Sequence, residues 1–244
     1  ISLLSTLEEK TELLSTTGLD YVLVLPFTKE FSNQGARDFI TNVLIDQLNI
    51  SEIILGYDHK FGHNREGDVN LLAEVLTKTG RFVTEIPAQD VDEIIVSSTK
   101  IRTALIQGEV ESANRLMGYN YQIKGKVVTG KQLGRTIGFP TANIEPMSDS
   151  KLIPGNGVYA VKTCIDGITY QGMMNIGIRP TVSNSNHRVI EVHLFDFNSD
   201  IYGDALTISL CHRLRGEQTF SGIEELTKQL KKDEVDSRRH FASL

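Results

Sequence analysis

The sequence predicts an α/β region followed by a smaller, mainly β region, and two patterns support this division. Before Gly118, continuous apolar runs alternate with amphipathic helical segments, which is typical of a parallel α/β sheet covered by helices. After Gly118, short strands follow one another with turn residues between them, which favours a small closed antiparallel barrel. We therefore predict one domain at residues 1–118 and a second at residues 119–244.

The elements of the α/β region follow from caps, periodicity and breakers. Thr6 and Glu9 form the capping box that begins the first helix, and Pro26 ends an apolar run that predicts a buried strand at 21–25. The predicted helices are 6–16, 36–48, 71–79, 99–107 and 109–117, and the predicted strands are 21–25, 52–55 and 81–86.

The β region contains five clear strands and a closing helix. Asp166 and Gly167 predict a hairpin turn between the second and third strand. The predicted strands are 121–128, 157–164, 169–174, 189–195 and 205–210, and residues 184–186 are predicted to form a mobile loop. In the last helix, at 222–239, we expect Ile223, Leu226, Leu230 and Val235 to face inward.

Composition excludes several classes of protein. The net charge of −6 argues against a general nucleic-acid binder, and no apolar run has the length of a membrane span. Cys164 and Cys211 form no C-x-x-C pair, so we expect reduced, buried thiols in a cytoplasmic protein. The sequence begins at Ile1 rather than Met and has no signal-peptide pattern, which indicates an incomplete amino-terminal end.

The stretch from Gly125 to Asn143 carries the main candidate site. A glycine-punctuated loop lets the backbone approach a ligand, and two oxygen donors, Thr141 and Asn143, follow Pro140. Such donors beside a phosphate suit Mg²⁺ that is held jointly with a nucleotide. A glycine-rich hairpin loop without a ligand remains the alternative, because the spacing matches neither the P-loop nor the dinucleotide fingerprint.

Two polar stretches of the α/β region are further candidates. The stretch from Gly56 to Gly62 follows a predicted strand directly, where open α/β sheets bind ligands, although it also fits a turn with a hydrogen-bonded Asp. Ser97, Ser98 and Thr99 begin a helix, with Arg102 one turn later. This pattern suits an anion and also fits a plain helix cap.

Glu191 is a candidate general base in the β region. It shares one face of a predicted strand with His193, and the other face is apolar. The alternative is a solvent-facing Glu on an amphipathic strand. His193 is the next candidate for a base if Glu191 has only a surface role.

The motif G-x-V-V-x-G-x-x-x-G-R-x-x-G-F-P-T-A-N resembles the ATP-binding segment of riboflavin kinase. Four later stretches agree in order: 157–161, 175–181, 191–203 and 214–215. The upstream half is similar to the adenylyltransferase module that is fused to this kinase in bacteria. The chain thus resembles the bifunctional riboflavin kinase/FAD synthetase family, minus its amino-terminal end. The resemblance implies a Rossmann-like nucleotidyltransferase domain and a β-barrel kinase domain with a C-terminal helix.

The resemblance also implies roles for individual residues. Glu191 would be catalytic, Thr141 and Asn143 would hold the metal, and Arg215 would contact flavin in the kinase. The implied ATP-binding residues of the kinase are Gly130, Arg135, Gly138, Thr141 and Asn143. The implied nucleotide and flavin residues of the adenylyltransferase are Gly56, Asp58, Phe61, Gly62, Ser97, Ser98, Thr99 and Arg102. His59 stands where the family commonly has an aromatic residue, so its role is open, and the family's H-x-G-H motif lies upstream of Ile1.

The predicted function is FAD biosynthesis. Riboflavin and ATP would give FMN and ADP, and in the intact protein FMN and ATP would give FAD and pyrophosphate. Mg²⁺ would accompany ATP, the flavins would be substrates and products, and no nucleic acid or membrane partner is expected. The alternatives are a kinase with a non-catalytic first domain and a flavin- or nucleotide-binding regulator. The oligomeric state is not predicted.

Overall fold

The computed structural model describes residues 2–88, 90–91, 94–130, 133–179 and 187–243. The chain forms two compact units, one of Leu19–Ile95 and one of Ile1–Gly18 with Val96–Leu244. The units therefore do not coincide with the predicted division at Gly118, because the first helix and the two helices before Gly118 pack with the barrel. A division by function at Gly118 remains a proposal.

The Leu19–Ile95 unit is built around two parallel strands. Strands β1 (Glu52–Gly56) and β2 (Phe82–Ile86) pair from Glu52–Phe82 to Gly56–Ile86, and α4 (Val69–Thr77) packs on β2. The other elements are α2 (Lys29–Ser32), α3 (Ala36–Asp38), the π-helix η1 (Phe39–Gln47), the 3-10 helix η2 (His63–Arg65), β3 (Asp90–Val91) and β4 (Ile94–Ile95). The core contains Ile40, Leu44, Leu55, Leu72 and Leu76.

The predicted buried strand at 21–25 is wrong. These residues form no strand, and Tyr21 is 92% exposed. A strand needs a hydrogen-bonded neighbour, and within the described residues β1 pairs with β2 alone. Strand β1 is itself only partly covered, since Leu55 is buried and Ile53 half-buried, whereas Ile54 is 60% exposed. An apolar run predicts β propensity, but the neighbouring chain decides pairing and burial.

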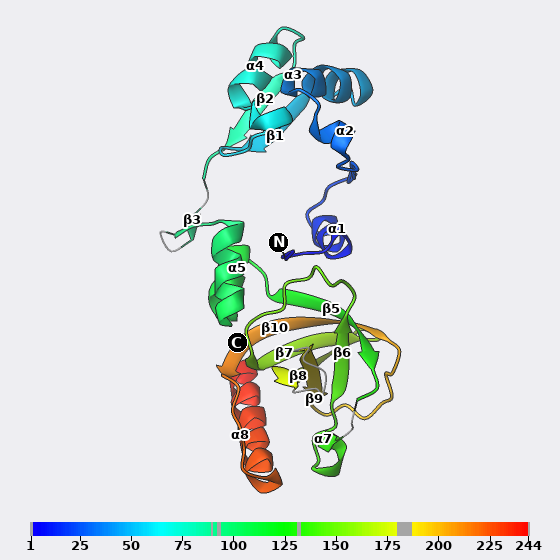
Figure 1. Cartoon of the computed structure of the whole chain (residues 1–244), viewed down its shortest axis with the longest axis vertical. Helices are drawn as coiled ribbons and strands as arrows, with labels where there is room; N and C mark the ends of the chain where they lie inside the picture. The colour runs from blue at the N-terminus through cyan, green and yellow to red at the C-terminus, as the bar shows by residue number, and fades with distance from the viewer. Residues whose placement is uncertain (1, 89, 92–93, 131–132, 180–186, 244) are drawn as a thin grey trace. The chain divides into compact units, whose positions relative to one another are not determined.

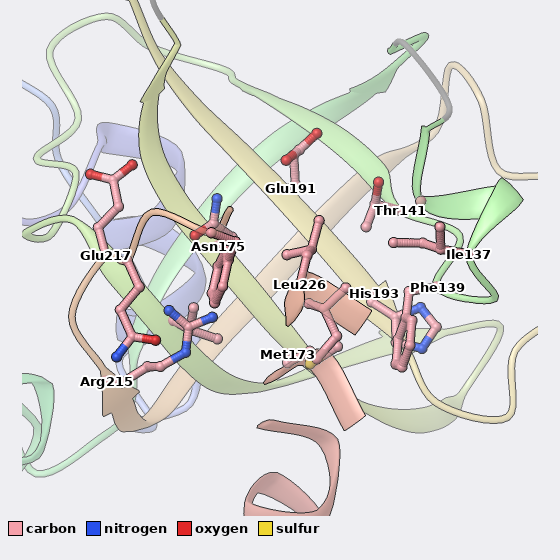
Figure 2. Close-up of a pocket in the computed structure, with 15 residues that line it drawn as sticks. Ile137, Phe139, Thr141, Met173, Asn175, Glu191, His193, Arg215, Glu217 and Leu226 are labelled. Carbon is pink, nitrogen blue, oxygen red and sulfur yellow. The ribbon is translucent and has the colours of Figure 1, made fainter. Parts of the chain in front are cut away.

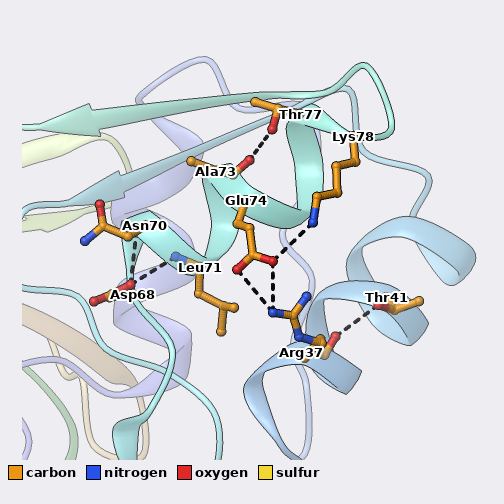
Figure 3. A network of polar contacts seen from close by, with 9 residues as sticks. All are labelled: Arg37, Thr41, Asp68, Asn70, Leu71, Ala73, Glu74, Thr77 and Lys78. Carbon is orange, nitrogen blue, oxygen red and sulfur yellow. Dashed lines mark hydrogen bonds and ion pairs between the residues drawn. The ribbon is translucent and has the colours of Figure 1, made fainter.

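Charged side chains fix the two ends of α4 (Figure 3). Asp68 caps the helix by accepting hydrogen bonds from the backbone N–H groups of Asn70 and Leu71, and the ammonium of Lys60 holds the pKa of Asp68 below its usual range. Glu74 pairs with Lys78 and with Arg37, each at 3.2 Å, which lowers the pKa of Glu74. The Arg37 contact ties α4 to α3.

The second unit contains a closed antiparallel barrel with the strand order β10-β5-β6-β9-β8-β7 (Figure 1). The strands are β5 (Tyr121–Val128), β6 (Ala142–Pro146), β7 (Gly157–Ile165), β8 (Ile168–Arg179), β9 (His187–Leu194) and β10 (Ala205–Arg215). The predicted barrel and the Asp166–Gly167 hairpin turn are confirmed, since both residues have positive φ between β7 and β8. Strand β6 was not predicted, and the loop predicted at 184–186 lies outside the described residues.

Three helices from the first half of the sequence pack on the barrel unit. Helix α1 (Leu7–Ser15) begins with the predicted Thr6–Glu9 capping box, and α5 (Ser98–Gln107) and α6 (Val110–Met117) end at Gly108 and Gly118 as predicted. Glu9 is buried and forms an ion pair of 2.6 Å with Lys151. Burial lowers the pKa of Lys151, and the carboxylate of Glu9 opposes this shift.

The final helix, α8 (Ile223–Ala242), contacts β7, β8 and β10 with a face that includes Leu226 and Leu230, as predicted, but not the other two predicted residues. Ile223 is 58% exposed and Val235 is 53% exposed, so their predicted inward positions are wrong. The buried residues are Asp233, Ser237 and Phe241, and Leu226 and Leu230 are partly buried. These five positions recur at helical spacing. Because Asp233 and Ser237 are polar, a prediction based on apolar residues does not identify them as buried.

Two further expectations concern exposure. Both cysteines are free, but only Cys211 is buried, so the prediction of a buried thiol is wrong for Cys164. Within the described part of the chain, no helix combines the length and the apolar character that a membrane crossing requires.

Candidate functional site

A row of three polar side chains crosses the barrel wall. In the strand register Asn143 of β6 pairs with Glu191 of β9, which pairs with Asn175 of β8. Paired residues on neighbouring strands project from the same face of a sheet. The next row, Ile144, Ile190 and Ile176, is buried in the barrel core. The polar row therefore lies on the outer face of the barrel, as the alternation around Glu191 predicted.

A second row lies beside the first. His193 pairs with Met173, and Thr141 immediately precedes the pair formed by Ala142 and Val192. Continuing the antiparallel register places Thr141 opposite His193. The strands thus bring the predicted residues Thr141, Asn143 and Glu191 together on one surface.

This surface forms the wall of a cavity of about 290 Å³ (Figure 2). In Figure 2, Phe139 and His193 lie on one flank, and Arg215 and Glu217 lie on the other. Helix α8 contributes Leu226 and Leu230. The lining residues are Gly134, Ile137, Phe139, Thr141, Val158, Met173, Asn175, Glu191, His193, Arg215, Glu217, Gln218, Phe220, Leu226 and Leu230. Apolar and aromatic walls with a polar end suit a planar organic ligand.

Arg215 lines this cavity, but its guanidinium is held by α8. Its Nε and one terminal nitrogen donate to the carboxylate of Asp233 at 2.8–3.1 Å, and Gln229 donates to the same carboxylate at 2.7 Å. The Arg215 and Asp233 side chains are 14% and 3% exposed. The pair therefore fixes the position of α8 against β10, whether or not Arg215 also contacts a ligand.

Glu217 stands at the polar end of the cavity. One carboxylate oxygen accepts from the Asn156 amide at 3.0 Å, and the other accepts from the backbone N–H of Ile178 at 3.4 Å. Arg188, to which the sequence assigned no role, donates to Asn156 and to the backbone carbonyls of Ile153 and Pro154. These contacts fix the loop that holds Glu217.

A second cavity, of about 300 Å³, begins on the other side of Thr141. The lining residues are Val127, Arg135, Pro140, Thr141, Ala142, Val192, Leu194, Phe197, Asn198, Ser199, Asp200, Ile201 and Tyr202. Thr141 is the residue that the two cavities have in common among the described residues. A group bound in one cavity can therefore meet a group bound in the other at Thr141.

The glycine-rich loop packs onto Asn143. A Cβ atom on Gly130 would lie 2.0 Å from the amide nitrogen of Asn143, so a side chain at position 130 would displace Asn143, which is 8% exposed. After the short helix α7 (Leu133–Thr136), the chain turns through Gly138 with φ of +85°. Arg135 lines the second cavity, whereas Gly138 lines neither cavity in the described part of the chain. Lys131, the second basic residue of this loop in the sequence, lies outside the described residues.

The Leu19–Ile95 unit contains a separate aromatic cavity of about 320 Å³. Its lining residues are Phe27, Phe31, Ser32, Gln34, Phe39, His59, Lys60, Phe61, Gly62 and Arg65. The rings of His59 and Phe61 are stacked at 6.4 Å and 22°, so His59 extends the aromatic wall. Of the predicted residues, Phe61 and Gly62 line this cavity, and Gly56 and Asp58 lie at the carboxyl end of β1.

The predicted anion-binding segment begins α5 in the other compact unit. Ser97 caps the helix by accepting a hydrogen bond of 3.3 Å from the backbone N–H of Lys100, and Ser98 and Thr99 form its first turn. The Nε of Arg102 donates to the backbone carbonyl of Ser2 at 3.1 Å. The cap occupies the Ser97 oxygen as an acceptor. A phosphate would be bound by N–H and O–H donors instead.

Asn175, Glu217, Leu226 and Leu230 are cavity residues to which the sequence assigned no site role. Asn175 lies in a stretch that carried the family resemblance, and alternation along β8 places it on the outer face. The signal that identifies it is the pairing with Glu191, which depends on the register between two strands. Leu226 and Leu230 were predicted to face inward but not to line a ligand cavity.

The chain is similar to known proteins over its whole length. Residues 117–241 match the family model of riboflavin kinase, and residues 1–100 match that of FAD synthetase. Bifunctional riboflavin kinase/FMN adenylyltransferase from Listeria monocytogenes is 41% identical over all of this chain and 77% of its own length. The enzyme of the same name from Bacillus subtilis is 39% identical over 99% of this chain and 76% of its own length.

A solved structure is also similar. A crystal structure described as a macrolide-efflux protein from Streptococcus pneumoniae is 31% identical, with a TM-score of 0.88, over 96% of this chain and 75% of that one.

Proposed function

Since this chain belongs to the bifunctional riboflavin kinase/FMN adenylyltransferase family, we propose that the two cavities meeting at Thr141 form its riboflavin kinase site. The family acts in FAD biosynthesis with both activities, and this chain is a transferase whose adenylylation of FMN is assigned to the intact protein. The relatives are all named as bifunctional riboflavin kinase/FMN adenylyltransferases. This leaves two alternatives without support, namely a kinase with a non-catalytic first domain and a flavin- or nucleotide-binding regulator. The observation that carries the proposal is the row Asn143–Glu191–Asn175 beside that junction.

The 290 Å³ cavity suits the flavin. Phe139, Leu226 and Leu230 offer apolar contact to a planar ring system, while Glu217 and Asn175 offer polar groups to its heteroatoms. Arg215 remains a proposed flavin contact, with its charge already balanced by Asp233. In this arrangement the ribityl chain extends toward Glu191 and Thr141.

The 300 Å³ cavity suits the nucleotide. Arg135 supplies positive charge, and the glycine loop that packs on Asn143 supplies backbone close to the phosphates. Gly130, Gly138, Thr141 and Asn143 complete the proposed ATP-binding residues. A nucleotide here would direct its γ-phosphate toward Thr141, where the first cavity begins.

Glu191 is the proposed general base. Its carboxylate would accept the proton of the riboflavin 5′-hydroxyl while that oxygen attacks the γ-phosphorus of ATP and ADP leaves. Asn143 and Asn175, the register neighbours of Glu191, would orient the reacting groups. Most of the remaining catalysis in phosphoryl transfer comes from alignment and charge neutralisation.

A metal ion fits this donor set. Thr141 offers a hydroxyl oxygen and Asn143 an amide oxygen, and both belong to the face that carries Glu191. Mg²⁺ binds oxygen ligands and takes only one or two from the protein when phosphates supply others. We therefore propose that Thr141 and Asn143 hold Mg²⁺ with ATP, where the ion would neutralise phosphate charge.

The adenylyltransferase reaction is proposed for residues 1–118, and the kinase reaction for residues 119–244. The aromatic cavity around Phe61 and His59 suits the flavin ring of FMN, because aromatic side chains stack on planar ligands. Gly56, Asp58 and Gly62 are proposed to contact nucleotide or flavin there. Ser97, Ser98, Thr99 and Arg102 are proposed to bind ATP phosphates at the start of α5.

The partners of the chain in this proposal are ATP, riboflavin and FMN. The cytoplasm, which supplies ATP, is the proposed location. Neither a nucleic acid nor a membrane is needed for any proposed step.

Replacement of Glu191 by glutamine tests the kinase proposal. Glutamine keeps the size and hydrogen bonding of the side chain but cannot accept the proton. We expect FMN formation from riboflavin and Mg-ATP to slow by ~10²–10⁴-fold, or about 3–5 kcal/mol of transition-state stabilisation, with little change in KM. In the intact protein, FAD formation from supplied FMN should continue at the parental rate.

Glu145→Gln is the matched control, because Glu145 is an exposed carboxylate on β6 that lines neither cavity. It should retain parental FMN formation. Near-parental turnover of Glu191→Gln would refute the assignment of the base.

A further inference from the structure

His193 makes a hydrogen bond that links the two cavities. Its Nδ1 atom lies 2.7 Å from the backbone carbonyl oxygen of Pro140. A carbonyl oxygen can only accept, so Nδ1 carries the proton of this bond. Both the neutral Nδ1–H tautomer and the imidazolium can donate it. His193 lines the first cavity, and Pro140 lines the second.

Aromatic packing fixes the orientation of the His193 ring. The ring lies edge-on to Phe139 at 5.3 Å and 65°, and to Phe195 at 5.8 Å and 66°. Phe139 is 6% exposed and Phe195 is 3% exposed, and both belong to one buried cluster with Val158. Two buried neighbours therefore hold the imidazole in place, which preorganises its bond to Pro140.

The bond acts where strand pairing ends. The pairing of β6 with β9 begins at Ala142 and Val192, so Thr141 lies one residue outside the ladder. Pro140 has no N–H group, so its carbonyl oxygen is the only backbone hydrogen-bonding group that this residue offers. From Ala142 onward, backbone pairing holds β6 against β9. Beyond the end of this pairing, the side chain of His193 holds the two segments together instead.

We propose that His193 is a positioning residue that fixes the Pro140–Thr141 peptide, and with it the Thr141 hydroxyl, at the junction of the two cavities. This inference rests on the proposed kinase site and adds to it a group that does not exchange protons with substrate. It differs from a role as general base, because the bond to Pro140 uses the proton on Nδ1 and needs no change in protonation.

Two substitutions separate the positioning role from packing and from base catalysis. His193→Asn can place its amide N–H₂ near the position of Nδ1, so it can still donate to Pro140, but it cannot act as a base. His193→Phe keeps an aromatic ring against Phe139 and Phe195 but has no donor. Thermal melting of both variants, compared with the parent, shows whether the barrel is intact.

The measurements are kcat/KM for Mg-ATP in FMN formation and the affinity for Mg-ATP by calorimetry. Misplacement of a reacting group by about 1 Å can reduce the rate ~10²-fold, so we expect His193→Phe to lose roughly 10- to 100-fold in kcat/KM and to bind Mg-ATP more weakly. His193→Asn should keep most of both. If the parent protein formed no FMN, the proposed function would be overturned. The calorimetric measurement of Mg-ATP affinity would still test the positioning role in that case.

Two results would overturn the inference. If both variants lost activity equally while melting like the parent, the imidazole itself would be required, as for a base. If His193→Phe kept parental kcat/KM and Mg-ATP affinity, the bond to Pro140 would have no role in positioning Thr141.

Discussion

Replacing Arg215 by methionine should destabilise the barrel unit, because it leaves Asp233 buried without its counter-charge. Three contacts of 2.8–3.1 Å join the Arg215 guanidinium to this carboxylate, whose side chain is 3% exposed. The variant retains only the 2.7 Å hydrogen bond from Gln229 to Asp233 among these contacts. Methionine fills much of the volume of the arginine stem, so the main loss is electrostatic.

The magnitude follows from burial. Removing one partner of a buried ion pair costs about 3–5 kcal/mol, because the remaining charge has lost its solvent and its partner. For a unit of this size, 1 kcal/mol shifts the melting temperature by about 2–4 °C. We therefore expect Arg215→Met to lower the melting temperature of the barrel unit by roughly 6–20 °C.

The assay is thermal and urea unfolding followed by circular dichroism, with Arg239→Met as the control. Arg239 lies on the same helix and pairs with Asp236, but its side chain is 74% exposed. An exposed pair of this kind contributes at most about 1 kcal/mol. If Arg215→Met were no more destabilised than Arg239→Met, the pair with Asp233 would not hold α8 as the geometry indicates.

A double variant separates the clamp from a direct contact with flavin. Arg215→Met combined with Asp233→Leu removes both charges and should recover much of the lost stability. If Arg215 acts only through α8, KM for riboflavin should recover as well. A KM that stays high in a stable double variant would support the predicted contact between Arg215 and flavin.

Three further substitutions and conditions test other parts of the molecule. Thr141→Ala should raise KM for Mg-ATP and lower turnover, because it removes an oxygen donor at the cavity junction; unchanged initial rates at limiting Mg-ATP would contradict this. In the intact protein, Phe61→Ala should weaken FMN adenylylation and leave FMN formation intact, and an equal loss of both activities in coupled assays would disprove the separate flavin cavity. Burial and the neighbouring His212 lower the pKa of His240 below 6.5. The folded protein therefore favours the neutral ring, and the stability linked to this preference is present above pH 6.5 and is lost as the pH falls through the folded-state pKa of His240. Urea unfolding at decreasing pH should show this loss, and His240→Gln should reduce it.

Local chemistry determined the helix ends. The capping box of Thr6 and Glu9 and the ends of α5 and α6 at Gly108 and Gly118 lie where the sequence predicts them. Each depends on bonds between residues within one turn of each other, so tertiary contacts were not needed to identify them. The alternation around Glu191 is equally local, and it correctly placed this residue opposite the apolar face of β9.

Non-local contacts decided the rest. The run at 21–25 has a strand-like sequence but forms no strand, because pairing depends on a neighbouring chain. Asp233 looks like a solvent-facing residue in α8, yet it is buried, because Arg215 on β10 balances its charge. The sequence alone identified Thr141, Asn143 and Glu191 as candidates, but the row that joins Glu191 to Asn175 and the bond from His193 to Pro140 depend on the register of β6, β9 and β8. Register is a relation between strands far apart in the chain, and the pattern within any one strand leaves it open.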